Sequence, residues 1–425
     1  ISMSLLRLAW ASLWNRRSTA LLAVLAIAMS VALLLSVERI RRDARTSFTN
    51  TVSGVDLVVG ARSGAVQLLL YSVFRIGNAT NNVSWESYAE IVARPDVAWS
   101  IPFSLGDSHR GYRVLGTSDA YFEHYRHGDG RALAFTAGTP FDDLFDAVLG
   151  SEVVRELGYA LGDPLVVAHG TGRVGLVEHD EQPFRVAGIL APTGTPVDAT
   201  VHVSLAGIEA MHADWQRGAR VPGQVTAPDA LRARFGAGEL EPRAVTAFLL
   251  GLDSPRSVFR VQRAINEYRD EPLLAVLPGV ALQELWNLVG VAERALLIVS
   301  GCVVFAGLVN LVSVLLAGLE ERRREIAILR ASGARPLHVF ALLCAEAGLL
   351  GAGGIVLGVL AHLVAVLVGG WWLERAFGLA VSVGLPTARD GATLALIFCC
   401  AVLAGCLPAW RACRRSLADG MTVRL

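Results

Sequence analysis

The stretch Leu319–Phe340 reads L-E-E-R-R-R-E-I-A-I-L-R-A-S-G-A-R-P-L-H-V-F and forms a short charged segment between two long hydrophobic windows. Gly333 stands where a helix end favours a left-handed cap, and Pro336 is suited to the first turn of the next helix. We therefore expect a short helix and a tight turn at one membrane surface, where a partner outside the lipid can bind them.

The composition indicates that much of the chain lies in lipid. Hydrophobic residues make up 53% and charged residues 18% of the 425 residues, and the mean hydropathy is +0.48. Such a chain is too apolar for an ordinary soluble protein of this length. Four windows are long enough to cross a hydrocarbon core of roughly 30 Å. They are about Thr19–Val37, Ala295–Leu319, Val339–Gly370 and Gly391–Trp410.

The arginines predict which side each connection faces, because positive residues beside spans stay in the cytoplasm. They gather in the N-terminal tail, in the loop after the second window and in the C-terminal tail, so these segments should be cytoplasmic. Arg39, Arg41, Arg42 and Arg45 follow the first window on the opposite side. They open a long domain, however, and long domains cross the membrane largely regardless of charge. The large insert between the first two windows should therefore face outward.

Several chemical functions are excluded by what the sequence lacks. The chain has no lysine, so a phosphate-binding loop of the form G-x-x-x-x-G-K-[ST] cannot exist. No G-x-S-x-G, H-E-x-x-H or paired C-x-x-C occurs either. Two groups of residues are candidate metal clusters: His124 with His127, and His169 with His179 and Asp180. The number of histidines is ordinary for a chain of this length. We predict no catalytic residues, no metal site, no bound cofactor and no nucleic-acid partner.

The insert has the pattern of an α+β domain. Strands are predicted at Val55–Val59, Val97–Phe103 and Tyr112–Leu115, with a helix at Trp85–Val92. A second set follows, with a strand at Ala244–Leu250, a helix capped by Ser254 that runs to about Tyr268, and a strand at Leu273–Leu277. Two β-α-β units around an insertion predict a split ferredoxin-like subdomain. The intervening residues 120–239 are rich in Gly and Pro and predict a mainly β subdomain.

The predicted organisation is four transmembrane helices plus an α+β outward domain. Its segments are a cytoplasmic or interfacial helix (1–18), transmembrane helix 1 (19–37), the outward domain (38–280), a stalk with transmembrane helix 2 (281–319), a cytoplasmic loop (320–338), transmembrane helix 3 (339–370), a short outward loop (371–390), transmembrane helix 4 (391–410) and a cytoplasmic tail (411–425). The stalk is inferred from an apolar stripe that continues from about Ala281 into the second window, giving one helix of about 58 Å.

The segment R-R-E-I-A-I-L-R-A-S-G-A-R resembles the coupling segment of FtsX-like and MacB-type (type VII) ABC transporter permeases. The resemblance implies that it docks in a groove of a cytoplasmic ABC ATPase, which binds the ATP. The matching residues are Glu325, Ile326, Ile328, Leu329, Arg330, Gly333, Ala334 and Arg335. The stretch Leu407–Met421 also resembles the family's terminal motif, but departs from it at Ser416 and Asp419.

Three stretches of the insert resemble the MacB-type periplasmic core domain: Asp146–Leu157, Phe184–Leu190 and Thr193–Val203. In that family the ferredoxin-like half is called the porter subdomain and the mainly β half the sabre subdomain. The resemblance therefore implies a multi-pass protein of the bacterial inner membrane with its large domain in the periplasm.

The resemblance further implies a permease that works by mechanotransmission as one of two copies, most simply a homodimer. ATP-driven movement of the coupling segment would change the shape of the periplasmic domain, for export or extraction of a substrate from the periplasm or the outer leaflet. A periplasmic adaptor, lipoprotein or hydrolase is a further expected partner besides membrane lipid. The alternative is an FtsX-like regulator that transports nothing and activates a periplasmic hydrolase; a stand-alone secondary carrier or enzyme is a third reading.

Two ionisable residues inside the third window, Glu346 and His362, are functional candidates because charged groups in spans are costly. Hydrogen bonding between helices, or a place at the cytoplasmic edge, is the simpler explanation of both.

Overall fold

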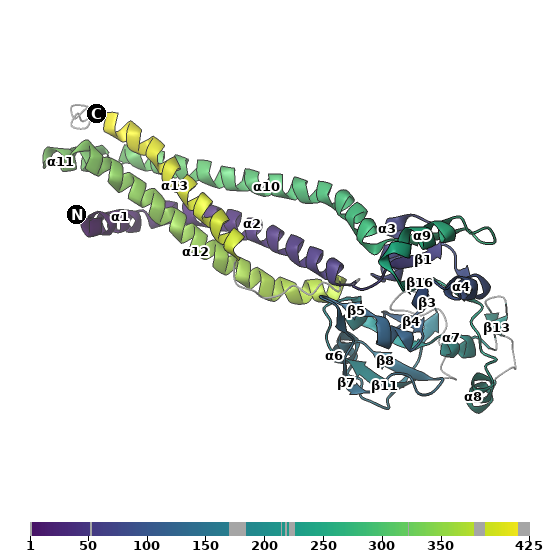
Figure 1. Cartoon of the computed structure of the whole chain (residues 1–425). Coiled ribbons are helices and arrows are strands. Elements are labelled where there is room, and N and C mark those ends of the chain that lie inside the picture. The colour runs from purple at the N-terminus through teal and green to yellow at the C-terminus, as the bar shows by residue number, and fades with distance from the viewer. Residues whose placement is uncertain are drawn as a thin grey trace. The chain divides into compact units, whose positions relative to one another are not determined.

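The computed structural model describes residues 2–51, 53–169, 184–213, 215–216, 219–220, 226–321, 323–377 and 387–414. The chain divides into two compact units (Figure 1). The helical unit comprises Ile1–Asp43 and Gly290–Leu425, and the α/β unit comprises Ala44–Val289. Both divisions fall inside long helices, so the chain passes between the units as helix.

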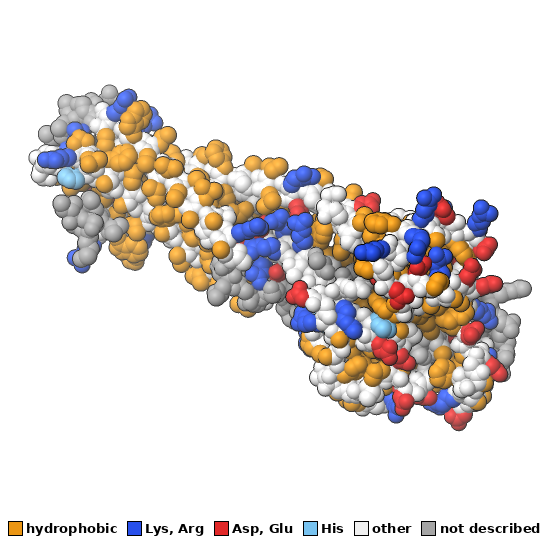
Figure 2. All heavy atoms as spheres, viewed as in Figure 1, with side chains coloured by type: hydrophobic (Ala, Val, Ile, Leu, Met, Phe, Trp, Pro, Cys, Tyr) orange, Lys and Arg blue, Asp and Glu red, His pale blue; other side chains and the backbone are white. Residues whose placement is uncertain are grey.

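Six helices contribute to the helical unit. They are α1 (Ser2–Asn15), α2 (Arg17–Thr51), α10 (Pro278–Glu321), α11 (Arg323–Ala331), α12 (Pro336–Phe377) and α13 (Ala388–Arg414). In the described part of the chain, four segments are long and apolar enough to cross a membrane: Arg17–Asp43, Pro278–Leu319, Pro336–Gly370 and Ala388–Arg414. Each predicted window lies inside one of these helices. On the face that Figure 2 shows, apolar side chains cover most of the flank of these helices.

A narrow apolar core holds α2, α10, α12 and α13 together. It contains Ile27, Leu311, Leu350 and Ala401, one from each helix. Gly354 brings α12 close to α2, because a Cβ added there would lie 2.6 Å from the Cβ of Ile27. The small residues of the third window therefore serve close helix packing, as their spacing indicates.

Ion pairs account for the arginines that follow the first window. Arg41 lies 3.8 Å from Glu293 of α10, and Arg42 pairs with Asp390 of α13. Arg39 pairs within α2 with Asp43, at 3.0 Å. These three arginines are therefore paired with acidic side chains within the helical unit.

The strands of the α/β unit are β1 (Leu57–Ala61), β2 (Val83–Ser84), β3 (Val97–His109), β4 (Tyr112–Thr117), β5 (Arg126–His127), β6 (Arg131–Ala132), β7 (Phe135–Gly138), β8 (Asp146–Leu149), β9 (Pro164–Leu165), β10 (Ala168–His169), β11 (Phe184–Leu190), β12 (Thr200–Ser204), β13 (Trp215–Gln216), β14 (Ala219–Arg220), β15 (Ala244–Val245), β16 (Ala247–Leu252) and β17 (Leu273–Val276). Its helices are α3 (Ala65–Ser72), α4 (Trp85–Val92), α5 (Ala120–His124), α6 (Ser151–Leu157), α7 (Leu205–Met211), α8 (Pro228–Gly236) and α9 (Val258–Asn266), with 3-10 turns at Pro196–Ala199 and Pro255–Ser257.

The first half of the main sheet has the ferredoxin-like arrangement. Its strand order is β17-β1-β16-β3 with antiparallel neighbours. The helices α4 and α9 pack on one face, where Tyr88, Ile91 and Val261 meet strand residues in one apolar cluster. Ser254 caps the 3-10 turn that begins α9, as predicted. The helix α3, which was not predicted, covers the opposite face through Leu68 and Leu69.

The second half of the sheet continues from the first through β3. The N-terminal part of β3 pairs with β16, and its C-terminal part pairs with β4. The order then runs β4-β12-β8-β11-β7. The three stretches that resemble the periplasmic core domain form β8 with α6, β11, and the turn before β12 with β12 itself. They lie side by side, because β8 pairs with both β11 and β12.

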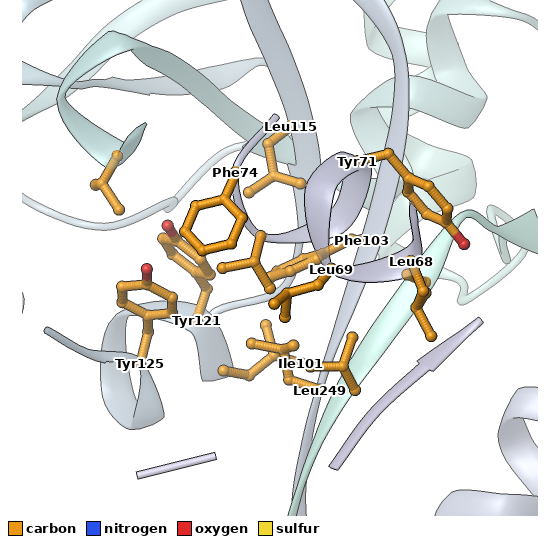
Figure 3. Packing of buried hydrophobic residues seen from close by; sticks show 14 of the residues in the cluster. Leu68, Leu69, Tyr71, Phe74, Ile101, Phe103, Leu115, Tyr121, Tyr125 and Leu249 are labelled. Atoms are coloured by element: carbon orange, nitrogen blue, oxygen red, sulfur yellow. The ribbon is translucent and has the colours of Figure 1, made fainter. Parts of the chain in front are cut away.

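The ends of two long helices belong to the core of the α/β unit. Ala281, Leu282 and Leu285 at the start of α10 are at most 9% exposed and join the cluster shown in Figure 3. Phe48, near the end of α2, lies 5.6 Å from the ring of Trp286. These segments are therefore folded into the α/β unit, and α10 begins inside its core.

Candidate functional site

Gly333 ends α11 with a Schellman motif. Its φ of +101° is in the left-handed region that favours glycine. The amide of Ala334 donates to the carbonyl of Leu329 at 3.0 Å, and the amide of Gly333 donates to the carbonyl of Arg330 at 3.1 Å. This is the 6→1 and 5→2 pair that defines the motif. The predicted cap is confirmed, and α12 begins at Pro336 as expected.

The two sides of α11 have different environments. On the inner side, Ala327 is buried, and Ile326 packs against a cluster that includes Leu319 of α10 and Val339 of α12. On the outer side, Ile328 is 60% exposed and Glu325 is exposed. Glu325 in the first turn and Arg330 in the last turn have the charges that a helix dipole favours at each end. The inner side fixes α11 on the bundle and leaves the outer side accessible.

The start of α12 adds a second exposed apolar residue. Leu337 is 73% exposed. Nδ1 of His338 accepts a hydrogen bond from the amide of Arg335 at 3.2 Å, which satisfies a donor at the helix start. The thiol of Cys413 in α13 donates to the carbonyl of Pro336 at 3.2 Å. The position of Leu337 is thus set by its neighbours on both helices.

We define the coupling surface as the exposed residues Glu325, Ile328, Gly333, Arg335 and Leu337. The other residues of the predicted coupling segment, Ile326, Leu329, Arg330 and Ala334, are half-buried and support it. Two exposed aliphatic side chains flanked by opposite charges are suited to a hydrophobic contact with a polar rim. Leu337 was not among the predicted coupling residues, although it is apolar and directly follows Pro336.

A hollow of about 450 Å³ lies beside Glu325. Its other walls come from the end of α1 and the start of α2, including Trp14, Asn15 and Arg17. Nη1 of Arg16 donates to the carbonyl of Gly318 at 2.7 Å, which ties this corner of the chain to the end of α10. The N-terminal helix is thereby a neighbour of the coupling surface, which the sequence analysis did not foresee.

The two intramembrane candidates have different surroundings. Oγ of Ser36 in α2 is 2.9 Å from Nδ1 of His362 in α12, a hydrogen bond between helices. Glu346 is 2% exposed and lines a cavity of about 280 Å³ together with Arg16, Thr19 and Ser313. Neither residue is placed for chemistry on a substrate by these contacts, and their role as functional sites stays a prediction.

Among the described residues, no three His, Cys, Asp or Glu side chains lie close enough together to hold a metal ion. His124 stacks on Trp99 with ring centroids 5.1 Å apart, and burial followed by repulsion from Arg131 lowers the pKa of His127. The side chains of the second candidate cluster (His169, His179, Asp180), the residues Arg322, Ser416 and Asp419, and residues 378–386 of the outward loop lie outside what the structure describes.

The chain is similar to known proteins along most of its length. A sequence model described as MacB-like periplasmic core domain matches residues 20–268, and one described as FtsX-like permease C-terminal matches residues 297–417. No curated protein matches the chain.

Two solved structures are similar to part of the chain. The periplasmic region of MacB from Actinobacillus actinomycetemcomitans is 10% identical with a TM-score of 0.32, covering 55% of this chain and 95% of that one. The extracellular domain of the noncanonic ABC-type transporter YknZ from Gram-positive bacteria is 11% identical with a TM-score of 0.29, covering 52% of this chain and 99% of that one.

Proposed function

Since the chain belongs to the FtsX-like permeases that carry a MacB-like periplasmic core domain, we propose that it transmits the movements of an ABC ATPase to its periplasmic domain. The carrying observation is α10, one helix from Pro278 to Glu321. Leu282 and Leu285 at its start are buried in the core of the α/β unit, and its end leads into the coupling surface. A displacement of the coupling surface therefore acts on a helix whose other end is part of the periplasmic fold.

We propose that a partner ABC ATPase supplies the nucleotide-binding site. Members of this family work with a cytoplasmic ABC ATPase, and this chain lacks the lysine that a phosphate-binding loop requires. ATP is then bound by the partner alone, and this chain contributes no catalytic residue. One chain presents one coupling surface, whereas a symmetric ATPase dimer offers two grooves. We propose an assembly of two permeases and two ATPases, with two identical permeases as the simplest form.

The chain is a membrane protein with a periplasmic-type domain, and we place it in the bacterial inner membrane. The substrate, which would be a lipoprotein, lipid, peptide or other compound of the periplasm or outer leaflet, would be met by the α/β unit. An adaptor or a lipoprotein carrier on the periplasmic side is the natural further partner. Regulation of a periplasmic hydrolase without transport uses the same coupling surface and remains the second candidate. The α/β unit is larger than the outward domain typical of such regulators, which favours transport or extraction.

Two residues inserted after Asn287 test the proposal. Asn287 is exposed and directly follows the anchored start of α10. The insertion turns the anchored start by about 200° relative to the rest of the helix, given 3.6 residues per turn. We expect complementation of a deletion strain to be lost while the partner ATPase still binds ATP and still copurifies with the permease.

The control is the same two-residue insertion after Gly238, in an exposed turn where an added Cβ would meet nothing within 4 Å. This variant should complement normally. Normal complementation by a stably expressed Asn287 insertion would show that α10 is a passive tether, and mechanotransmission would have to be abandoned.

A further inference from the structure

A cavity of about 250 Å³ lies in the α/β unit beside the loop that joins α3 to β2. The loop contributes Arg75, Gly77, Asn78 and Asn82 to its wall, and Arg113 comes from β4. Two guanidinium groups thus line one small cavity, although the residues are far apart in the sequence. Nothing in the coupling mechanism uses either of them.

The backbone of Arg75 adopts an unfavourable conformation. Its φ is +60°, in the left-handed region that residues with a Cβ rarely occupy. Such conformations persist where the surrounding structure enforces them, and they are frequent at binding sites. The guanidinium carbon of Arg75 lies 4.7 Å from the centroid of the Phe103 ring, which appears in Figure 3 with Tyr121 and Tyr125. The loop therefore holds the Arg75 side chain in one place against the core.

The charge of Arg75 is incompletely satisfied. Its Nη1 is buried and has no hydrogen-bond partner among the described residues, and the same holds for the nearby hydroxyl of Tyr121. Burial lowers the pKa of Arg75, and attraction to Tyr121 and Tyr125, together with hydrogen bonding to Tyr121, offsets part of this effect. The neighbours of this guanidinium are hydroxyl groups and no carboxylate, and a buried cation is costly unless an anion or another strong acceptor reaches it.

Arg113 supports the loop and adds a second positive charge. Its Nη1 donates to Oδ1 of Asn78 at 2.9 Å, and its Nη2 donates to the carbonyl of Gly77 at 2.9 Å. These bonds use two of the five N–H groups of a guanidinium, so donors are left for a ligand. Burial and then repulsion from Arg75 lower the pKa of Arg113, which means that the two cations are close enough to interact.

Within the described ranges, no Asp or Glu side chain lies within ion-pair distance of Arg75 or Arg113. In the same unit Arg232 pairs with Asp143 at 2.9 Å. We propose that the cavity binds a small oxyanion, a phosphate or carboxylate group, between Arg75 and Arg113. Guanidinium groups bind both kinds of group through paired N–H donors.

The size of the cavity limits the ligand. Pockets for drug-sized molecules measure roughly 300–1,000 Å³. This cavity is below that range, so it admits a single anionic group, either as a free ion or as the end of a larger ligand. The proposal is independent of the proposed function, because binding requires neither the ATPase nor movement of α10.

Isothermal titration of the purified full chain tests the proposal, with inorganic phosphate and succinate as probes at constant ionic strength. We expect saturable binding of at least one probe to the unaltered protein. Arg113→Gln should weaken it about tenfold or more, since a hydrogen bond to a charged group is worth that much. Arg263→Gln is the control, because Arg263 lies on the exposed side of α9 and pairs with Glu267. The probe that binds more tightly identifies the group as phosphate or carboxylate.

Arg75→Gln should abolish binding. Because Arg113 also holds the loop through Gly77 and Asn78, the unfolding midpoint of Arg113→Gln is measured beside its affinity, and an unchanged midpoint assigns the loss of affinity to the lost ligand contact. Absence of saturable binding to the unaltered protein would overturn the proposal. Equal affinities in the Arg113→Gln and Arg263→Gln variants would also overturn it, because the anion would then bind elsewhere on the surface.

Discussion

The two units use apolar side chains in opposite ways. In the α/β unit large apolar residues are inside, and Phe248, for example, is fully buried between strands and helices. In the helical unit they are outside, with Ile298 and Phe305 of α10 each 68% exposed. The first arrangement stabilises a fold in water by removing apolar area from it. The second gives no such benefit in water and is stable only where lipid or another protein covers the surface.

The comparison shows that an exposed apolar residue has two meanings in this chain. Along the spans it faces lipid, as Ile298 does. Ile328 in α11 and Leu337 in the first turn of α12 are 60% and 73% exposed beside arginines and a glutamate, at the end of the apolar helices. Exposed patches of this kind mark sites of protein interaction. We therefore propose that the same physical property serves contact with lipid in one place and docking of the ATPase in the other.

The largest expected effect concerns the coupling surface. Ile328→Asp places a charge in the centre of the proposed contact, and Gly333→Pro is incompatible with a φ of +101° and removes the amide that bonds to Arg330. Glu325→Arg reverses the charge at the edge of the contact. We expect each to abolish copurification of the ATPase, a loss of about 100-fold in affinity or more.

Gly333→Asn is the matched control, because asparagine tolerates left-handed backbone and should keep docking. Membrane insertion of every variant is checked by fractionation. Full copurification of the ATPase with Ile328→Asp and Gly333→Pro would mean that the partner binds another surface.

The second prediction concerns the point where the two units join. The fragment Ala44–Val289 keeps the start of α10 in its core, whereas Ser47–Gly279 loses Leu282 and Leu285. At about 1.5–3 kcal/mol for each buried leucine, the shorter fragment should be less stable by about 3–6 kcal/mol. Urea unfolding of both fragments measures the difference.

Two matched substitutions in the longer fragment, Ala44–Val289, distinguish the effect of losing a buried leucine from the effect of shortening the chain. Leu285→Ala should cost about 2–5 kcal/mol, whereas Leu288→Ala should cost little because Leu288 is 64% exposed. Equal unfolding midpoints for the two fragments would show that the core closes without α10.

Local sequence pattern predicted most helices and strands of the α/β unit. Where it failed, the bounds or type of the element depend on tertiary pairing. The helix Trp85–Val92 was predicted with the bounds that it has. The strand predicted to end at Phe103 continues to His109, because the second half of the sheet pairs with its extension. The run A-V-Q-L-L-L-Y-S is apolar at positions that suit either a strand or a helix, so periodicity alone did not identify α3.

The sequence predicted which residues form the candidate site, but not which of them are buried and which are exposed. The cap at Gly333 follows from local sequence. The division of α11 into an inner side with Ile326 and an outer side with Ile328 depends on contacts with α10 and α12, which no local pattern contains. Similarly, Arg75 and Arg113 share a cavity only because α3, its loop and β4 fold together.

The third prediction concerns the pH dependence of the stability of the α/β unit. His202 is fully buried, its Nδ1 lies 3.1 Å from the carbonyl of Val148, and burial lowers its pKa to about 3. The unfolded chain takes up this proton near pH 6.5, whereas the folded chain stays neutral. Stability is therefore fully present above about pH 6.5 and is lost as the pH falls, by up to about 1.4 kcal/mol per pH unit.

The variant His202→Asn keeps a donor near Val148 and removes the titration. Between pH 6 and pH 4.5, the free energy of unfolding of the fragment Ala44–Val289 should fall by roughly 2 kcal/mol less in this variant than in the unaltered fragment. His124→Asn, on a partly exposed side chain, is the control. An unchanged pH dependence in His202→Asn would mean that His202 is protonated in the folded state.

The smallest expected effect compares one kind of hydrogen bond in the two units. Ser36 bonds to His362 in the helical unit at 2.9 Å, and Ser100 bonds to Tyr88 in the α/β unit at 2.8 Å. Ser36→Ala should cost about 0.6 kcal/mol, since hydrogen bonds between membrane helices are weak on average. Ser100→Ala should cost about 1 kcal/mol. Both are measured by unfolding of the full chain in lipid nanodiscs.

The unfolded helices still find polar partners within the bilayer, which is why lipid does not strengthen the bond between Ser36 and His362. A cost above about 2 kcal/mol for Ser36→Ala would exceed the range known for such bonds. It would assign His362 a structural role that the rest of the helical unit does not share.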